Sequence, residues 1–187
     1  MKAWLLKRWK DVLFFAFVGL LLIPQVRKPI QVFVQQLLAG NPQELSTPEQ
    51  KRVEPFNWSL QNLQGKPRNL SQSKGEVILI NSWATWCPPC IAEMPSLQAL
   101  YNDFHQRVDF YFVSNEKQQL LRKWLNQKSF KLPVYQTRGA IPPPLNSTSL
   151  PTTYVIDREG VIRIEEVGAH DWNSPAFRQQ LESLIAE

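Results

Sequence analysis

The sequence predicts an α/β domain in which a mixed sheet lies between helices, preceded by an N-terminal membrane segment. Three observations support this prediction. Over residues 53–187, strand-length apolar runs alternate with helix-length apolar repeats in the order ββ-βαβα(β)-ββα. The only two cysteines, Cys87 and Cys90, stand where a predicted buried strand gives way to a helix. An apolar run over residues 12–26 follows four basic residues.

The first predicted elements of the domain are a hairpin and two buried strands. Residues 56–60 and 67–70 flank Asn-Leu-Gln-Gly at 62–65, a sequence typical of a β-hairpin turn. Residues 77–80 read Val-Ile-Leu-Ile, and a continuous apolar run of this length is typical of a strand that is buried on both faces. A second buried strand is expected at residues 108–113.

Three helices are predicted in the domain. Residues 91–104 and 117–127 repeat apolar side chains with the spacing of an α-helix. A third helix is expected from Pro175 onward, because Ser174 is a favoured N-cap residue and proline is favoured at the first helical position. On the second helix, the predicted apolar face consists of Leu120, Leu121, Trp124 and Leu125.

The remaining predicted elements are short. Residues 132–135 are expected to form a strand, and residues 140–150 a proline-rich loop. Alternating segments at 153–157 and 161–166, joined by Arg-Glu-Gly at 158–160, predict a second hairpin. Together, these elements predict a central mixed sheet that is flanked by helices.

Charge is distributed unevenly along the chain. Residues 1–52 carry eight Lys or Arg against three Asp or Glu, whereas residues 53–187 carry thirteen of each. The net charge of +5 therefore comes from the N-terminal region. A nucleic-acid-binding surface on the folded domain explains this distribution poorly, and basic residues that flank a membrane segment explain it better.

The apolar run at 12–26 is interpreted as an uncleaved membrane anchor. Fifteen helical residues span about 22 Å, short for a hydrocarbon core of about 30 Å, so the length also suits a signal peptide. No small-x-small cleavage site follows the run, and Asn41 stands where a lipoprotein signal needs a cysteine. The preceding basic residues predict a cytoplasmic stub at 1–11 and an extracytoplasmic location for residues 27–187.

Residues 27–52 are predicted to tether the domain at 53–187 to the anchor. Within them, residues 29–40 repeat apolar side chains with helical spacing. This pattern indicates either a short amphipathic helix on the membrane surface or a continuation of the anchor, and both interpretations stay open. The repeating apolar residues are Ile30, Phe33, Val34, Leu37 and Leu38.

Cys87 and Cys90 are predicted to form a redox-active pair. A disulfide framework needs more cysteines and a zinc site needs four ligands, whereas two cysteines separated by two residues can close on each other. At the start of a helix, free N–H groups and the helix dipole favour thiolate over thiol. His105 and His170 lack metal-ligand spacing to the pair and are interpreted as structural or surface residues.

Two separated motifs identify a resemblance to a known family. Residues 81–90 read Asn-Ser-Trp-Ala-Thr-Trp-Cys-Pro-Pro-Cys, with Glu-Met-Pro at 93–95, and residues 151–160 read Pro-Thr-Thr-Tyr-Val-Ile-Asp-Arg-Glu-Gly. Over residues 53–187 the chain resembles the TlpA/ResA-like membrane-anchored thiol–disulfide oxidoreductases. The resemblance implies a thioredoxin fold with an N-terminal hairpin extension.

The resemblance also implies a function and a location. Such a domain lies on the periplasmic side of the cytoplasmic membrane and reduces disulfides of client proteins through its own cysteine pair, without another cofactor. Implied clients are apocytochrome c, in cytochrome c maturation, or metal-centre assembly proteins. The implied electron donor is a membrane protein of the CcdA/DsbD type.

Three residues receive chemical roles in the reaction, and Pro151, described below, completes the predicted catalytic set. Cys87, expected to be the more exposed cysteine, attacks the client disulfide, and Cys90 resolves the mixed disulfide. Glu93, one helical turn after Cys90, resembles the acidic residue of this family and is the candidate for proton transfer. The alternative is an exposed glutamate that only favours the helix dipole. Asn81 occupies a position where cytoplasmic thioredoxins have a buried aspartate, and it cannot titrate.

Client contacts are predicted beside the cysteine pair. Pro151 resembles the cis-proline that faces the active site in this fold, which leaves the backbone of Leu150 free to pair with an extended client. Trp86 is expected to offer an apolar contact, and Trp83 to lie in the core. Pro88 lacks an N–H group, so the attacking thiolate is expected to be stabilised less and the couple to be more reducing.

Other functions are weighed on single residues. A peroxidase of this fold needs a threonine where Ala84 stands. A disulfide-introducing oxidase or isomerase uses the same residues at a higher potential and stays open. A Cu(I)-handling module is expected to have methionine ligands, and Met94 is the only methionine of the domain. The loop 138–149 is a candidate border of the client groove, and segment 169–172 suggests no role.

Overall fold

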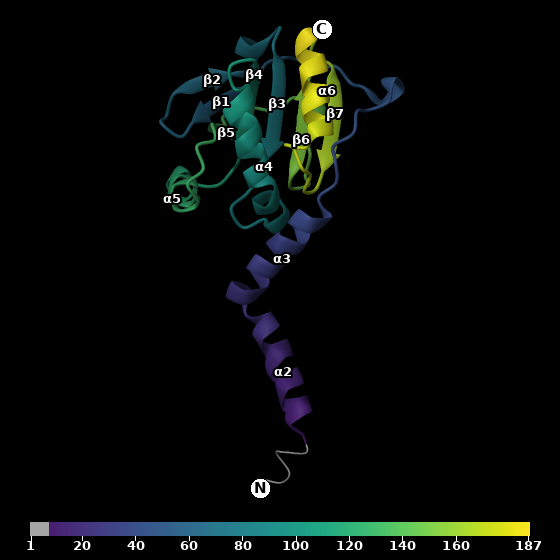
Figure 1. The fold of residues 1–187 in the computed structure, drawn as a ribbon. Coiled ribbons are helices and arrows are strands. Elements are labelled where there is room, and N and C mark those ends of the chain that lie inside the picture. The colour runs from purple at the N-terminus through teal and green to yellow at the C-terminus, as the bar shows by residue number, and fades with distance from the viewer. Residues whose placement is uncertain (1–7) are drawn as a thin grey trace.

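A seven-stranded mixed sheet forms the centre of the domain, with strand order β2-β1-β5-β4-β3-β6-β7 (Figure 1). The structure, a computed structural model, describes residues 8–187. Residues 1–7 of the predicted stub lie outside the described residues. The strands are β1 (Ser59–Asn62), β2 (Pro67–Asn69), β3 (Val77–Ser82), β4 (Val108–Val113), β5 (Val134–Thr137), β6 (Thr152–Ile156) and β7 (Ile162–Val167).

Strand β3 lies at the centre of the pairing, as its continuous apolar run predicts. It pairs parallel with β4 and antiparallel with β6, so that Ile80 lies between Tyr111 and Tyr154. Both predicted hairpins are confirmed, because β1 pairs antiparallel with β2 and β6 pairs antiparallel with β7. The short strand predicted at 132–135 lies two residues later, as β5.

The helices of the domain begin close to their predicted positions. They are α4 (Pro88–Phe104), α5 (Gln118–Lys128) and α6 (Pro175–Ala186). At the start of α6, the Ser174 Oγ accepts a hydrogen bond from the Phe177 N–H at 3.3 Å, which confirms the predicted N-cap. The described residues also contain three short 3-10 helices: η1 (Thr47–Glu49), η2 (Leu70–Ser73) and η3 (Pro143–Leu145).

The two faces of the sheet are covered differently. Val77 and Leu79 of β3 face a cluster that contains the buried apolar residues of α4, α5 and α6, whereas Ile78 and Ile80 face a second cluster. That second cluster is closed by side chains from η2, η3 and the segment before β1. The prediction of helices on both faces is therefore wrong, because all three long helices of the domain cover one face. In Figure 1, α4 and α6 cross in front of the sheet.

Helix α5 also differs in detail from its predicted apolar face. Leu121 and Leu125 are buried against the sheet, and Trp124 packs on Trp83 and Phe130. Leu120, however, is 46% exposed, because it lies on the outer side of the helix. The helix therefore buries a narrower stripe than its sequence predicts.

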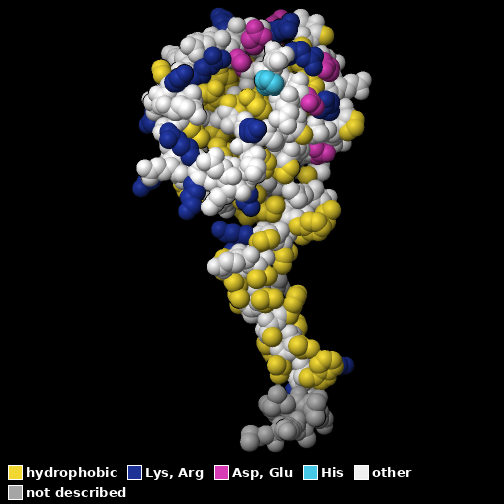
Figure 2. All heavy atoms as spheres, turned by 60° about the vertical axis from the view of Figure 1, so that its left-hand side comes forward, with side chains coloured by type: hydrophobic (Ala, Val, Ile, Leu, Met, Phe, Trp, Pro, Cys, Tyr) yellow, Lys and Arg dark blue, Asp and Glu magenta, His cyan; other side chains and the backbone are white. Residues whose placement is uncertain are grey.

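Two N-terminal helices precede the domain, namely α2 (Trp9–Leu22) and α3 (Pro24–Leu38). The run predicted as one anchor at 12–26 is thus divided at Ile23. Among the described residues, no single helix is long and apolar enough to cross a membrane, but α2 and α3, which are bent by 80°, meet that test of length and composition together. Figure 2 shows hydrophobic side chains over much of their surface.

Candidate active site

The cysteine pair lies at the junction between β3 and α4. The two cysteines are joined in a disulfide, and their Cα atoms are 5.3 Å apart. Cys87 is the N-cap of α4, and its Sγ accepts a hydrogen bond from the Cys90 N–H at 3.3 Å. Cys87 is 3% exposed and Cys90 is fully buried, so the predicted order of exposure is correct. Because Pro88 and Pro89 have no N–H group, the Cys90 N–H is the backbone donor of this first turn that bonds to Cys87 Sγ.

The loop between β3 and the pair is held from the neighbouring strand. Glu116, just after β4, accepts hydrogen bonds from the Thr85 N–H at 2.6 Å and from the Thr85 hydroxyl at 2.7 Å. The backbone N–H of Trp83 donates to the carbonyl of Val113 at 3.0 Å, and the Trp83 ring is buried in the core, as predicted. These contacts fix the approach to Cys87, and no local pattern of the sequence indicates Glu116.

Glu93 lies inside the protein rather than on the surface. Its side chain follows Cys90 by one turn of α4, and the residue is 1% exposed, which contradicts the alternative of an exposed glutamate. The Asn81 amide donates to Glu93 Oε1 at 2.7 Å, and the Trp172 indole N–H donates to Oε2 at 2.8 Å. The backbone N–H of His170 also donates to this carboxyl group. All three donors are neutral groups.

This environment changes the acidity of Glu93. Burial raises the pKa of its carboxyl group from 4.5 to about 7, although the hydrogen bonds from Trp172, Asn81 and His170 lower it in part. A carboxyl group with a pKa near neutrality can both take up and release a proton at physiological pH. Glu93 therefore has the acidity that a proton-transfer group beside Cys90 needs.

Asn81 can serve both protonation states of that carboxyl group. Its Nδ2 group donates to Glu93 Oε1 and to Thr153 Oγ1, at 2.7 and 2.8 Å. Among the described residues, its own carbonyl oxygen is buried without a hydrogen-bond partner. If the amide turns over, that oxygen can accept the proton of a neutral Glu93. Asn81 does not titrate, as predicted, but it lies in direct contact with the group that does.

Trp172 is a second site residue that the sequence does not reveal. Besides its indole bond to Glu93, its backbone N–H donates to Ser96 Oγ at 3.3 Å, so the segment after β7 is fastened to α4. The segment 169–172 suggests no role in the sequence, because its partners lie more than seventy residues away. An aromatic residue that carries a donor, within an otherwise polar stretch, is the only local signal.

Two of the four predicted client-contact residues line one cavity. The bond between Leu150 and Pro151 is cis, as predicted. Leu150 and Trp86 line a cavity of about 290 Å³, and Trp86 is 60% exposed. Pro88, two residues after Trp86, is half-buried and does not line this cavity. The loop 138–149 contributes Ile141, Leu145 and Ser147 to the lining of this cavity.

The two histidines lie outside this arrangement of side chains. The His105 ring is exposed and lies 3.1 Å from the carbonyl of Tyr101, beyond the last turn of α4. The His170 ring is half-buried, with Nε2 3.4 Å from Glu166 Oε2. Only the backbone of His170 takes part in the site, through Glu93.

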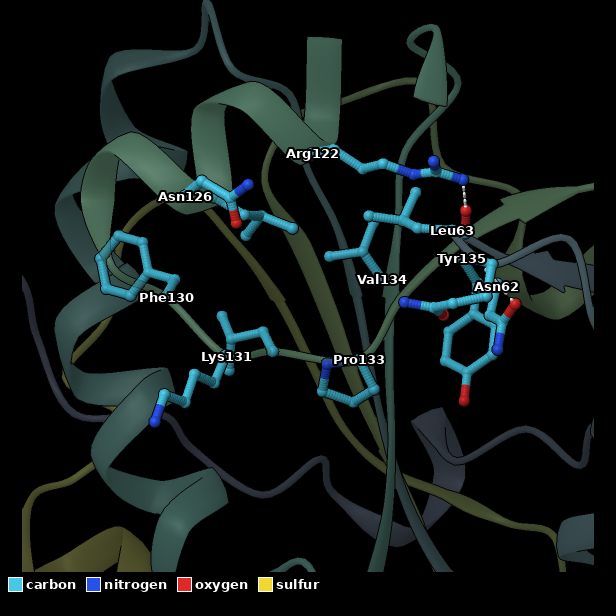
Figure 3. A pocket seen from close by; sticks show the side chains of 12 residues that line it. Asn62, Leu63, Arg122, Asn126, Phe130, Lys131, Pro133, Val134 and Tyr135 are labelled. Atoms are coloured by element: carbon cyan, nitrogen blue, oxygen red, sulfur yellow. Dashed lines mark hydrogen bonds between the residues drawn. The ribbon is translucent and has the colours of Figure 1, made fainter. Parts of the chain in front are cut away.

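A larger hollow of about 430 Å³ lies between α5, the β1–β2 turn and the start of β5 (Figure 3). Arg122 reaches across it and donates a hydrogen bond to the carbonyl of Leu63, which links α5 to the hairpin. Phe130, Lys131 and Pro133 lie along another side of it. Neither cysteine lines this hollow, so its size does not make it the reaction centre.

The fold and the cysteine site together define a class of protein. A mixed sheet with a disulfide at the first turn of the helix after its central strand, and a cis-proline before β6, defines a thioredoxin-fold thiol–disulfide oxidoreductase. The chain belongs to the AhpC/TSA family, whose family model matches residues 54–164. Within that family, the resemblance expected from the two motifs is confirmed by named relatives.

The chain is similar to several thiol–disulfide oxidoreductases over most of its length. It is 32% identical to thiol:disulfide interchange protein DsbE of Pseudomonas aeruginosa over 164 residues, which cover 84% of this chain and 87% of the relative. It is 30% identical to thiol-disulfide oxidoreductase ResA of Bacillus thuringiensis over 132 residues, which cover 69% and 73%. Thioredoxin-like protein YneN of Bacillus subtilis is 34% identical over 116 residues, which cover 60% and 68%.

Solved structures agree with the fold. A thiol:disulfide interchange protein from Chlorobium tepidum superposes with a TM-score of 0.57 at 23% identity, covering 72% of this chain and 97% of that one. StoA from Bacillus subtilis superposes with a TM-score of 0.55 at 20% identity, covering 71% and 98%. At these identities, the structures support the thioredoxin-like fold alone.

Proposed function

We propose that this protein is a membrane-tethered, extracytoplasmic reductant of protein disulfides that acts through Cys87 and Cys90. The observation that most supports this proposal is the cysteine pair at the start of α4, one helical turn before a buried carboxyl group whose pKa is about 7. The structure holds the oxidised form of the pair. In the proposed cycle, this form is the product of client reduction.

The proposed reaction begins with the reduced pair. The Cys87 thiolate attacks one sulfur of the client disulfide, so that a mixed disulfide forms and the other client sulfur leaves as a thiolate. Glu93 accepts the proton of the Cys90 thiol. The Cys90 thiolate then attacks Cys87 Sγ, which closes the Cys87–Cys90 disulfide and releases the second client thiolate. Two electrons pass to the client, whose thiolates take up two protons.

A partner must then reduce the pair again. We propose a membrane dithiol protein of the CcdA/DsbD type as the electron donor, and apocytochrome c or a metal-centre assembly protein as the client. Basic residues before the apolar N-terminal run support an anchor in the cytoplasmic membrane, with the domain on the periplasmic side. Trp86, Pro88, Leu150 and Pro151 are the proposed client contacts, at the cavity that two of them line.

A trapping experiment tests the roles of the two cysteines. In the Cys90→Ser variant, nothing resolves the mixed disulfide, so the reduced variant should accumulate a covalent adduct with a disulfide-containing test protein such as insulin. The Cys87→Ser variant should form no adduct. An adduct that forms through Cys90 instead, identified by peptide mass, would overturn the assignment of the attacking thiol.

A disulfide-introducing oxidase remains the second candidate, because it uses the same residues in the opposite direction. The missing N–H groups of Pro88 and Pro89 favour the reductant, since only the Cys90 N–H stabilises the Cys87 sulfur within this turn. A thiolate that is stabilised less corresponds to a more reducing pair.

A further inference from the structure

Helix α3 presents two different faces. One face lies on the domain: α3 packs against α4, and the Gln36 amide donates to the carbonyl of Ala92 at 3.2 Å. Val32, one turn earlier on the same face, is half-buried. The domain-facing side of α3 therefore rests on the first turns of α4, just after the cysteine pair.

The opposite face of α3 is an exposed apolar stripe. Ile30, Phe33, Val34 and Leu37 follow the i, i+3, i+4, i+7 spacing, and their exposed fractions range from 43 to 70%. Because successive residues turn by about 100°, the centre of this stripe lies across the helix from Val32. Nothing in residues 8–187 covers the stripe, and Figure 2 shows such side chains along the N-terminal helices.

A second connection joins the end of α3 to the cysteine site. Gly40 forms a parallel bridge with His170, and its carbonyl accepts a hydrogen bond from the Asp171 N–H at 2.9 Å. His170 and Trp172 on either side of Asp171 hold Glu93. The tether is thus bonded to the same short segment that holds the buried carboxyl group. In Figure 1, α3 lies below the N-terminal end of α4, and the other end of α4 points away from it.

The direction of α2 supports a membrane surface as the partner of the apolar stripe. α2 leaves α3 at 80° and exposes apolar side chains, including Leu13, Phe14, Phe15 and Phe17. If α2 lies along a membrane normal, α3 lies almost in the membrane plane. α3 carries Arg27 and Lys28 and no acidic residue, a charge that complements anionic headgroups.

We propose that the apolar stripe of α3 lies in the surface of an anionic bilayer and thereby holds the cysteine end of the domain against the membrane. This proposal rests on the membrane location proposed above. It specifies the electron donor further: the donor must present its dithiol at the level of the headgroups, where Trp86 and the cysteine pair lie. α4 has 17 residues and a length of about 25 Å, so its far end stands well clear of the bilayer.

Energy transfer from the protein to the membrane measures this orientation. The full chain, with Cys87 and Cys90 replaced by serine, carries one fluorescent donor at either Trp86→Cys or Gln106→Cys, two exposed positions near opposite ends of α4. It is reconstituted into vesicles of phosphatidylcholine and phosphatidylglycerol that contain a headgroup-labelled acceptor. We expect transfer from position 86 to exceed transfer from position 106 several-fold.

A matched pair of variants tests whether the stripe causes the orientation. Phe33→Glu with Leu37→Glu places two charges in the stripe, whereas Gln31→Glu with Gln35→Glu adds the same charge to the same helix outside it. The stripe variant should lose most of the difference between positions 86 and 106, and the control should keep it. Equal transfer from both positions in the unmodified helix would overturn the proposal.

Two further readouts separate this proposal from the proposed function. If a carbonate wash removes the protein from the vesicles, both the membrane location and the orientation are overturned. If the protein stays bound but energy transfer from positions 86 and 106 is equal, only the orientation is overturned. Insulin reduction by the cysteine-intact chain, measured in parallel with dithiothreitol as electron source, reports on the thiol chemistry and should be the same for both pairs of variants.

Discussion

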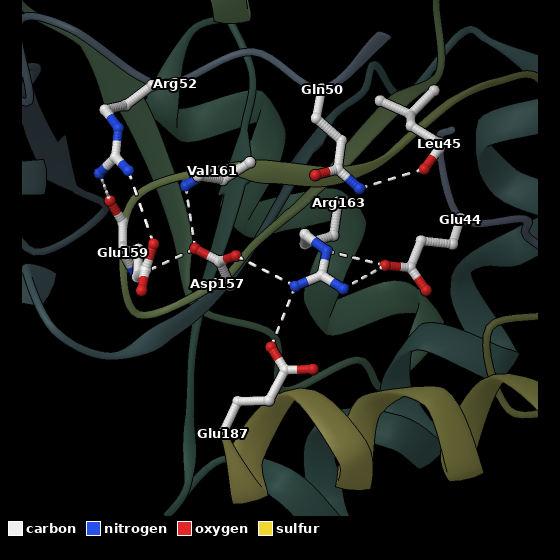
Figure 4. Close-up of polar contacts among 9 residues, drawn as sticks. All are labelled: Glu44, Leu45, Gln50, Arg52, Asp157, Glu159, Val161, Arg163 and Glu187. Carbon is white, nitrogen blue, oxygen red and sulfur yellow. Dashed lines mark hydrogen bonds and ion pairs between the residues drawn. The ribbon is translucent and has the colours of Figure 1, made fainter. Parts of the chain in front are cut away.

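Two carboxylate groups with little exposure lie at opposite ends of the central strands, and their surroundings differ in kind. Glu93, beside the cysteine pair, accepts hydrogen bonds from three neutral donors. Asp157, at the β6–β7 turn, lies 3.3 Å from the Arg163 guanidinium and also accepts from the N–H groups of Glu159 and Val161 (Figure 4). Both oxygens of each carboxylate accept a hydrogen bond, but only Asp157 has a cationic partner.

The difference agrees with a structural role for the Asp157 cluster and with the proton-transfer role proposed for Glu93. Arg163 binds Glu44 and Glu187 as well as Asp157, so one cation links the tether, the turn and the C-terminal end. Glu93 has no cation among its hydrogen-bond partners, and burial therefore raises its pKa to about 7. A buried carboxyl group without a cation destabilises the fold at high pH, which suggests that it is kept for proton transfer.

The largest expected effect is the dependence of stability on pH that Glu93 imposes. Between pH 4.5 and 7 the unfolded chain releases this proton while the folded chain keeps it, so the free energy of unfolding falls as pH rises and levels off above pH 7. The contribution is about 3 kcal/mol, from the pKa change of 4.5 to about 7. The free energy of unfolding is measured in urea from pH 4 to 8 for the oxidised protein and for Glu93→Gln. The difference in this free energy between the two proteins should change by that amount across the pH range. Parallel curves would refute the raised pKa.

Removal of the cation from the other cluster should destabilise the protein at all pH values near neutrality. Arg163→Met leaves the carboxylate of Asp157, which is only 9% exposed, without its cation, and should lower the free energy of unfolding by about 2–3 kcal/mol. Arg107→Met, which breaks an exposed pair with Glu182, should lower the free energy of unfolding far less, because solvent screens that pair. The rate of insulin reduction should change in neither variant. A slower rate in Arg163→Met would show that the two clusters are coupled.

Trp172→Phe should change the pKa of Glu93 while leaving the Glu93 side chain in place. The variant keeps an aromatic ring but loses the N–H group that lowers the pKa of Glu93, so this pKa should rise further. We expect a stability loss of about 1–2 kcal/mol at pH 8 and a pH–rate profile displaced to higher pH. Trp58→Phe removes a comparable buried indole bond, to Thr137 Oγ1 at 2.8 Å, and should lose similar stability with an unchanged profile. Identical profiles in both variants would remove Trp172 from the site.

The smallest expected effect concerns the client surface. Trp86→Ala removes an exposed aromatic side chain at the edge of the cavity and should lower kcat/KM for insulin about five- to tenfold, equivalent to about 1 kcal/mol. The exchange rate with dithiothreitol should stay the same, because a small thiol needs no apolar contact. Leu120→Ala, at an exposed apolar position on α5, serves as the control. A loss of the dithiothreitol reaction would show that Trp86 acts on the thiol itself.

The sequence predicts those features whose causes are local. The apolar run of β3, the Ser174 cap and the position of Cys87 at a helix start all depend on neighbouring residues, and all are present. The partners of Glu93 are not local, since Trp172 stands 79 residues away in the chain. The one-sided placement of the helices depends likewise on how distant strands pair. Hydrophobic periodicity reports that a helix is half-buried, but it does not report which face of the sheet the helix covers.

The reduction potential of the Cys87–Cys90 pair tests the proposed function most directly. It is measured on the full chain in detergent micelles, equilibrated against glutathione or dithiothreitol, with the two forms separated after thiol alkylation. The proposed reductant requires a value well below about −200 mV, toward the −270 mV of thioredoxin. A value near about −120 mV, in the range of strong disulfide donors, would contradict it and reverse the direction of electron flow.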